Sequence, residues 1–163
     1  MQHRIAVLKE KKFIGKRVMI SFAINRTGEL WRSFMPARKN IRNQVGSDLF
    51  SIEVYPPLFF DRFDPASEFE KWAAVEVTDF TFVPDGMEAI TVPGGLYAVF
   101  SYVGPASAAS SAYQHIFATW LPQSDFLLDD RPHLAVMGAG YKHEDPGSEE
   151  ELWIPVKPRT ASA

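Results

Sequence analysis

The chain has 163 residues, the size of one ordinary domain, and 46% of them are hydrophobic, which excludes a disordered chain. A formal net charge of −3 excludes the basic field that a nucleic-acid backbone needs. The sequence has no cysteine, so it has no disulfide, no thiolate metal site and no cysteine nucleophile. No apolar run reaches the roughly 18 residues of a membrane span, and we expect a cytoplasmic protein without a membrane segment.

Strands and one helix are predicted in the first half of the chain. Runs rich in Val, Ile and aromatic residues, bounded by Pro or Gly, predict strands at 5–7, 13–23, 49–55 and 72–82. Gly15 lies inside the second run and suggests a β-bulge. A helix is expected from Thr27, where Leu30, Trp31 and Phe34 recur at helical spacing. The aromatic and acidic residues 58–69 then form a loop.

The second half predicts the same order of elements. Strands are expected at 96–102, 134–137 and 151–156, a helix at 107–121, and a polar tail at 158–163. The order strand, helix, strand, strand therefore occurs twice, over residues 5–82 and 87–157. We interpret this as an α+β fold of duplicated β-α-β-β repeats with pseudo-twofold symmetry, in one domain over 1–163. Chance similarity between amphipathic segments is the alternative.

Six segments together resemble the GyrI-like, or bacterial transcription-activator effector-binding, domain family. They are Phe-Met-Pro-Ala-Arg at 34–38, Ile-Glu-Val-Tyr at 52–55, Trp-Ala-Ala-Val-Glu-Val at 72–77, Pro-Gly-Gly-Leu-Tyr-Ala-Val-Phe at 93–100, Thr-Trp-Leu-Pro-Gln-Ser at 119–124 and Glu-Glu-Glu-Leu-Trp-Ile-Pro-Val-Lys at 149–157. The resemblance runs from about residue 5 to residue 157. It implies antiparallel sheets with a ligand cleft between the two halves.

The resemblance also implies a function. Such a cleft takes small, lipophilic and often cationic molecules, and a carboxylate in the cleft commonly meets the cation. Many relatives carry a helix-turn-helix DNA reader before this domain, whereas few residues precede the first strand of this chain. The expectation is a stand-alone domain without direct nucleic-acid contact. Relatives often have an acid where this chain has Ala135, so either the usual central carboxylate is absent here or its role passes to Glu53 or Glu151.

Strand alternation gives candidate ligand-binding residues. Successive side chains of a strand point to opposite faces, so apolar residues at every second position should face the core and leave the others for the cleft. This gives Glu53, Tyr55, Trp72, Glu76, Glu151 and Trp153, and the candidates also include Tyr97 and the helix residue Trp120. Aromatic walls and a partly dry carboxylate would attract a delocalised cation. A glutamate on the outer face of a strand is, alternatively, simply solvated.

Three functions follow from these observations. The first is binding of a small lipophilic molecule, cationic or not, that the protein sequesters or senses. The second is interaction with a protein such as gyrase or a regulator, for which the acidic residues 144–151 are a candidate surface. The third is hydrolysis of a reactive xenobiotic by a water that a glutamate activates, with Tyr55 or Tyr97 as hydrogen-bond donor. The four histidines have no metal-ligand spacing, and we expect neither metal nor cofactor.

Overall fold

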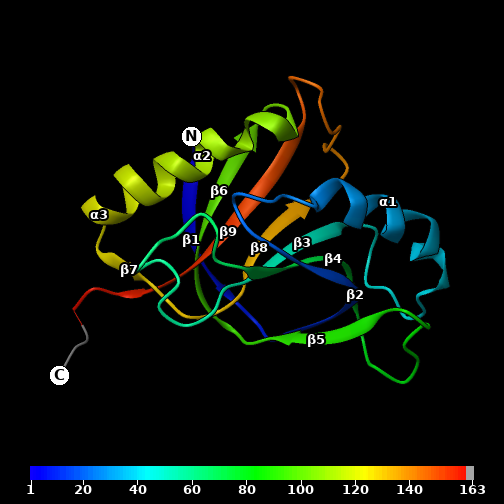
Figure 1. Ribbon diagram of the computed structural model, residues 1–163. Helices are drawn as coiled ribbons and strands as arrows, with labels where there is room; N and C mark the ends of the chain where they lie inside the picture. The colour runs from blue at the N-terminus through cyan, green and yellow to red at the C-terminus, as the bar shows by residue number, and fades with distance from the viewer. Residues whose placement is uncertain (161–163) are drawn as a thin grey trace.

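The computed structural model describes residues 1–160, which form an antiparallel sheet and two helical segments (Figure 1). The strands are β1 (His3–Leu8), β2 (Lys11–Ile20), β3 (Leu49–Val54), β4 (Phe69–Val77), β5 (Glu88–Val92), β6 (Gly95–Val103), β7 (Phe126–Leu128), β8 (His133–Met137) and β9 (Glu149–Pro158). Their order across the sheet is β1-β6-β9-β8-β3-β4-β2-β5, and β7 pairs with the C-terminal end of β9. The fold is α+β, as the sequence predicts.

Two helical segments pack on one face of this sheet. The first is α1 (Thr27–Ala37) with the short turn η1 (Arg38–Asn40). The second runs through η2 (Ala106–Ala108), α2 (Ala109–His115), the π-helical turn η3 (Ile116–Trp120) and α3 (Leu121–Gln123). Leu30 and Phe34 of α1 pack on Ala73, Val75 and Val77 of β4. The second segment covers β6, β8 and β9 in the same way through a separate cluster around Ile116.

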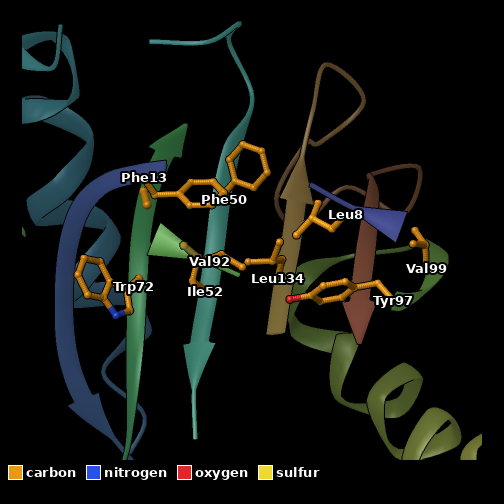
Figure 2. Close-up of a cluster of buried hydrophobic side chains, with 10 residues drawn as sticks. Leu8, Phe13, Phe50, Ile52, Trp72, Val92, Tyr97, Val99 and Leu134 are labelled. Atoms are coloured by element: carbon orange, nitrogen blue, oxygen red, sulfur yellow. The ribbon is translucent and has the colours of Figure 1, made fainter. Parts of the chain in front are cut away.

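The opposite face of the sheet is also a core. It curls so that Leu8 from the edge strand β1 and Val92 from the edge strand β5 join one buried cluster with Phe13, Ile52 and Tyr97 (Figure 2). Each of these five side chains is buried. The central strands are therefore apolar on both faces. For this reason, the alternation of apolar and polar residues along a strand does not show which side chains face the ligand cleft.

The two halves of the chain exchange their first strands. Strand β1 precedes β2 in sequence but pairs with β6, and β5 precedes β6 but pairs with β2. The two connections lie against each other, because a Cβ at Gly94 would be 2.7 Å from the Leu8 carbonyl oxygen. The strand order consequently reads as two similar four-strand halves, β1-β6-β9-β8 and β5-β2-β4-β3, joined by the pairing of β3 with β8.

Several local predictions need correction. Gly15 forms no bulge, since β2 pairs with β4 and β5 in unbroken register; a Cβ at Gly15 would collide with the Ala73 carbonyl oxygen, which is the reason for a glycine there. Strands β5 and β7 were not predicted, and β2 and β4 end before residues 23 and 82. Pro158 still pairs with Phe126, so the expected tail at 158–163 begins later, and residues 161–163 lie outside the described residues.

Candidate ligand-binding site

The centre of the sheet brings two polar residues of β3 under the helices. In the antiparallel pairing of β3 with β8, Ser51 lies opposite Ala135 and Glu53 lies opposite His133. Ser51 also lies opposite Ala73, whose side chain packs under α1, so this face is the helix side. We call the region around Ser51, Glu53 and His133, between α1 and α2, the central seam.

Glu53 is a buried carboxylate with one partner. Its Oε1 accepts a hydrogen bond from Lys71 Nζ at 2.6 Å, and the Glu53 and Lys71 side chains are only 9% and 15% exposed. The other oxygen, Glu53 Oε2, is buried without a hydrogen-bond partner, and so is Ser51 Oγ on the same strand. Buried polar atoms are almost always paired, because an unpaired one keeps the full cost of its desolvation. Two such atoms therefore lie on one face of β3, in the central seam.

Aromatic rings enclose one end of the central seam. Tyr55 follows β3 and lies 4.8 Å from the His133 ring, measured between ring centroids. Phe60, from the loop after β3, stacks on Phe117 of η3 at 5.2 Å and on His133 at 5.9 Å. Burial lowers the pKa of His133 from 6.5 to about 3, so this imidazole is neutral near pH 7 and does not repel a cation.

Two further groups come from the second half of the chain. Tyr113 of α2 is close enough to Glu53 and Glu150 that their charges, after burial itself, raise the pKa of its hydroxyl. Glu150 of β9 has a raised pKa because it is partly desolvated; the Lys71 ammonium opposes this rise and Glu53 adds to it. The central seam therefore contains two carboxylates, one ammonium and neutral aromatic groups, a combination that favours a cation over an anion.

A cavity of 260 Å³ opens beside this end of the central seam. Tyr55, Phe60 and His133 separate it from Glu53, and its other walls come from the loop after β3 and from the segment between β7 and β8. Asp61, Asp129 and Asp130 add carboxylates to its rim, where Arg131 and Lys157 also lie.

The structure separates the candidate residues that the sequence grouped. Only Glu53 and Tyr55 lie at the central seam. Trp72 and Trp153 lie on the opposite face of the sheet. They pair with Ile52 and Leu134, whose side chains belong to the hydrophobic cluster on the side away from the helices. The expectation that Glu53 and Trp72 share one face is therefore wrong.

Glu151 and Glu76 also lie away from the central seam, each in an ion pair of its own. Glu151 is paired with Arg4 at 3.0 Å and accepts the Trp153 indole N–H at 3.2 Å. Glu76 is paired with Lys11 at 3.2 Å, on the same side of β4 as Trp72. Both carboxylates are engaged with a basic side chain from another strand.

Tyr97 and Trp120 have structural surroundings. The Tyr97 hydroxyl donates a hydrogen bond to the Pro132 carbonyl at 2.8 Å, inside the curled sheet, and burial raises its pKa to about 12. The Trp120 ring packs edge-on against Phe100 at 5.0 Å in the core under the second helical segment. Tyr97 is consequently on the other side of the sheet from Glu53 and cannot assist it.

Four residues of the central seam were missed: Lys71, Tyr113, Phe117 and His133. Lys71 and His133 become neighbours of Glu53 only through strand register, which one sequence does not give. The Ser-x-Glu-x-Tyr alternation at 51–55 was the one local signal, since it places three polar side chains on one face of a strand.

Other kinds of site find no support among residues 1–160. No group of three or more His, Cys, Asp or Glu side chains in this range could hold a metal ion. No helix in the described part of the chain is long and apolar enough to cross a membrane.

Comparison with known proteins identifies the fold family. The family described as integron-associated effector binding protein matches residues 4–156, nearly the whole chain. The chain belongs to this family. The resemblance to GyrI-like effector-binding domains is thereby confirmed, and with it a general capacity for ligand binding.

Individual members of this effector-binding group are distant in sequence. The transcriptional regulator BrlR of Pseudomonas aeruginosa is 26% identical over 164 residues, which cover 96% of this chain and 56% of BrlR. The chain thus spans about half the length of that curated relative. SAV2435, in a structure bound to tetraphenylphosphonium, has a TM-score of 0.71 at 14% identity, covering 96% of this chain and 94% of that one. An integron cassette protein of Vibrio cholerae has a TM-score of 0.65 at 12% identity, with 95% of each chain covered.

Proposed function

We propose that this protein binds a small lipophilic cation at the central seam and thereby sequesters or senses it in the cytoplasm. The proposal includes no direct contact with nucleic acid, since the net charge is −3. The observation that carries it is Glu53: a buried carboxylate with one unpartnered oxygen, placed between two helices and beside aromatic rings.

The electrostatics of the central seam support a cation as the ligand. A carboxylate in a dry site is stabilised by any positive charge that can reach it, and Lys71 now supplies part of that stabilisation. The rings of Tyr55, Phe60 and Phe117 add cation–π attraction and apolar contact for the body of the ligand. Tetraphenylphosphonium in the SAV2435 structure is a lipophilic cation of this class.

The geometry favours binding over the two alternatives. For hydrolysis, Tyr97 has no support as the hydrogen-bond donor, because it is separated from Glu53 by the sheet, and Tyr55 is left as the candidate. The acidic residues 144–151 belong partly to the fold: Glu144 accepts hydrogen bonds from Ser107, and Glu149 and Glu151 lie in β9. They do not present one continuous acidic surface for a protein partner.

The test is a calorimetric titration with 2-naphthylmethylammonium and with 2-naphthylmethanol, its uncharged counterpart. We expect the ammonium to bind more tightly than the alcohol, and Glu53→Gln to weaken its binding at least about tenfold, the scale of a lost charge-assisted hydrogen bond. Glu151→Gln is the matched control, since it removes a carboxylate from the other face, and should change the affinity less than twofold. Equal weakening by both substitutions, or no binding at all, would contradict the proposal.

A further inference from the structure

We infer that the ligand of the central seam carries N–H donors, as an ammonium or amidinium group does, and is not a fully substituted cation. This inference rests on the proposed function and makes it more specific. It comes from two buried oxygen atoms, Ser51 Oγ and Glu53 Oε2, that have no hydrogen-bond partner.

The two oxygens lie on one face of one strand. Ser51 and Glu53 are two residues apart on β3, so both side chains point to the helix side and their Cα atoms are roughly 7 Å apart. The Ser51 residue is 6% exposed and Glu53 is 7% exposed, so neither is a surface group in contact with bulk solvent. A single polar head group placed between them can reach both oxygens.

The need for a donor follows from the chemistry of these oxygens. An ionised carboxylate oxygen only accepts hydrogen bonds, and a serine hydroxyl can accept while it donates elsewhere. Lys71 Nζ already donates a hydrogen bond to Glu53 Oε1. What Oε2 lacks is a hydrogen-bond donor, and a cation wrapped in carbon would bury this oxygen further without supplying one.

The surroundings favour a ligand with one charged end. Beyond Glu53, Tyr55, His133 and Phe60 form an apolar wall without a charged group, because His133 is neutral. A suitable ligand therefore has a donor-bearing cationic head at Ser51 and Glu53 and an aromatic body against these rings. Of the remaining charged neighbours, Glu150 adds to the attraction of the head and Lys71 opposes it.

The experiment compares two ligands of equal charge and equal ring. Calorimetric titrations would use 2-naphthylmethylammonium, with three N–H donors, and its N,N,N-trimethyl derivative, with none. For the unmodified protein we expect the ammonium to bind at least about tenfold more tightly. Ser51→Ala should reduce this preference severalfold, by weakening the ammonium and leaving the trimethyl compound unchanged. Ser101→Ala, at an exposed strand serine on the opposite face of the sheet, should leave the preference intact.

The outcomes separate the inference from the proposed function. If both compounds bind with equal affinity and both depend on Glu53, the inference is wrong and the proposed function stands. If neither compound binds, the proposed function itself fails. If the preference persists undiminished in Ser51→Ala, the two-oxygen geometry is wrong. The two compounds are compared on the unmodified protein, so the inference can be refuted even if a variant fails to fold.

Discussion

At the scale of single residues, the main feature of the central seam is the pairing of Glu53 with Lys71. Their 2.6 Å contact is nearly buried, so the pair is not screened as a surface ion pair would be. Lys71 stabilises the empty protein but also occupies one oxygen of the group that a cationic ligand would use. The same residue thus supports the fold and competes with the ligand.

Replacing Lys71 should consequently change stability and affinity in opposite directions. Lys71→Met leaves Glu53 buried without a counter-ion, and we expect the free energy of unfolding to fall by about 3 kcal/mol. The affinity for 2-naphthylmethylammonium should rise roughly tenfold, because the ligand becomes the only cation beside Glu53. Urea unfolding and calorimetry measure the two effects. Lys11→Met, which breaks the ion pair with Glu76 outside the central seam, is the control; weaker ligand binding in Lys71→Met would refute the competition.

His133 should make the stability depend on pH. Its folded-state pKa of about 3 lies below the ordinary 6.5, so below pH 6.5 the unfolded chain takes up a proton that the folded protein does not. Stability is complete above pH 6.5, and between pH 6.5 and 5 the free energy of unfolding should fall by about 2 kcal/mol. The raised pKa of Glu150 acts in the opposite direction, because there the folded protein takes up its proton first as the pH falls.

His133→Phe keeps a ring against Tyr55 and Phe60 and removes the titration. Urea unfolding at several pH values should show a flatter dependence between pH 6.5 and 5 for this variant. His115→Phe, at an exposed helix position, should keep the dependence of the unmodified protein. An unchanged slope in His133→Phe would mean that His133 is not buried in its neutral form.

The sequence predicts residues of the central seam only where the signal is local. Glu53 and Tyr55 were predicted because they alternate with Phe50, Ile52 and Val54 along one strand. The partners of Glu53 were not, because Lys71 and His133 reach it through the registers of two different strand pairs. Trp72 and Glu151 were assigned to the wrong face of the sheet for a related reason. Both faces are covered by a hydrophobic core, so a side chain that points away from the helices can still be buried.

The loop between β3 and β4 is the element that covers one end of the central seam. It carries Phe59, which packs with Phe69 and Ile20, and Phe60, which reaches across to Phe117 and His133 in the second half. In Figure 1 the loop lies beside β7. The π-helical turn η3 supplies Phe117, and such turns interrupt the regular helical phase of side chains.

Shortening Phe60 should open this end of the central seam. In Phe60→Ala the stacked ring is lost and the cavity beside Tyr55 and His133 joins the central seam. We expect the association rate of 2-naphthylmethylammonium to rise severalfold in stopped-flow measurements, and the free energy of unfolding to fall by roughly 2 kcal/mol. Phe63→Ala, in the same loop but 52% exposed, is the control for a general loosening of the loop. An unchanged rate in Phe60→Ala would show that ligands enter by another route.

Helices and strands were predicted correctly where the spacing of apolar residues agreed with the Pro and Gly residues that bound the segment. The helix from Thr27 and the strands around 49–55 and 96–102 are present, with ends that differ by a few residues. Strand β5 was missed because Glu88–Val92 is short and mostly exposed, and it becomes a strand by pairing with β2. Strand β7 likewise has three residues and depends on its pairing with β9.

The exchange of β1 and β5 ties the whole molecule together. Each half lends its first strand to the other, and the inner core takes side chains from both edges of the sheet. The repeats over 5–82 and 87–157, which the sequence suggests, are therefore not independent folding units in this structure. The central seam, with groups from β3, β4, α2, β8 and β9, exists only when both halves are assembled.

Separating the repeats should abolish folding. A fragment of residues 1–84 lacks β5, the partner of β2, and leaves β1 without β6. We expect circular dichroism to show no cooperative thermal unfolding for this fragment or for 85–163 alone, and partial recovery when they are mixed. Cooperative unfolding of either isolated fragment would contradict the interdependence of the halves.

The most direct test of the central claim is a crystal structure of the protein with 2-naphthylmethylammonium. The account predicts the ammonium nitrogen within hydrogen-bond distance of Glu53 Oε2 and Ser51 Oγ. It also predicts the naphthyl ring against Tyr55 and His133, with Phe60 displaced. A ring bound on the opposite face of the sheet, against Trp72 or Trp153 and beside Glu151, would contradict it.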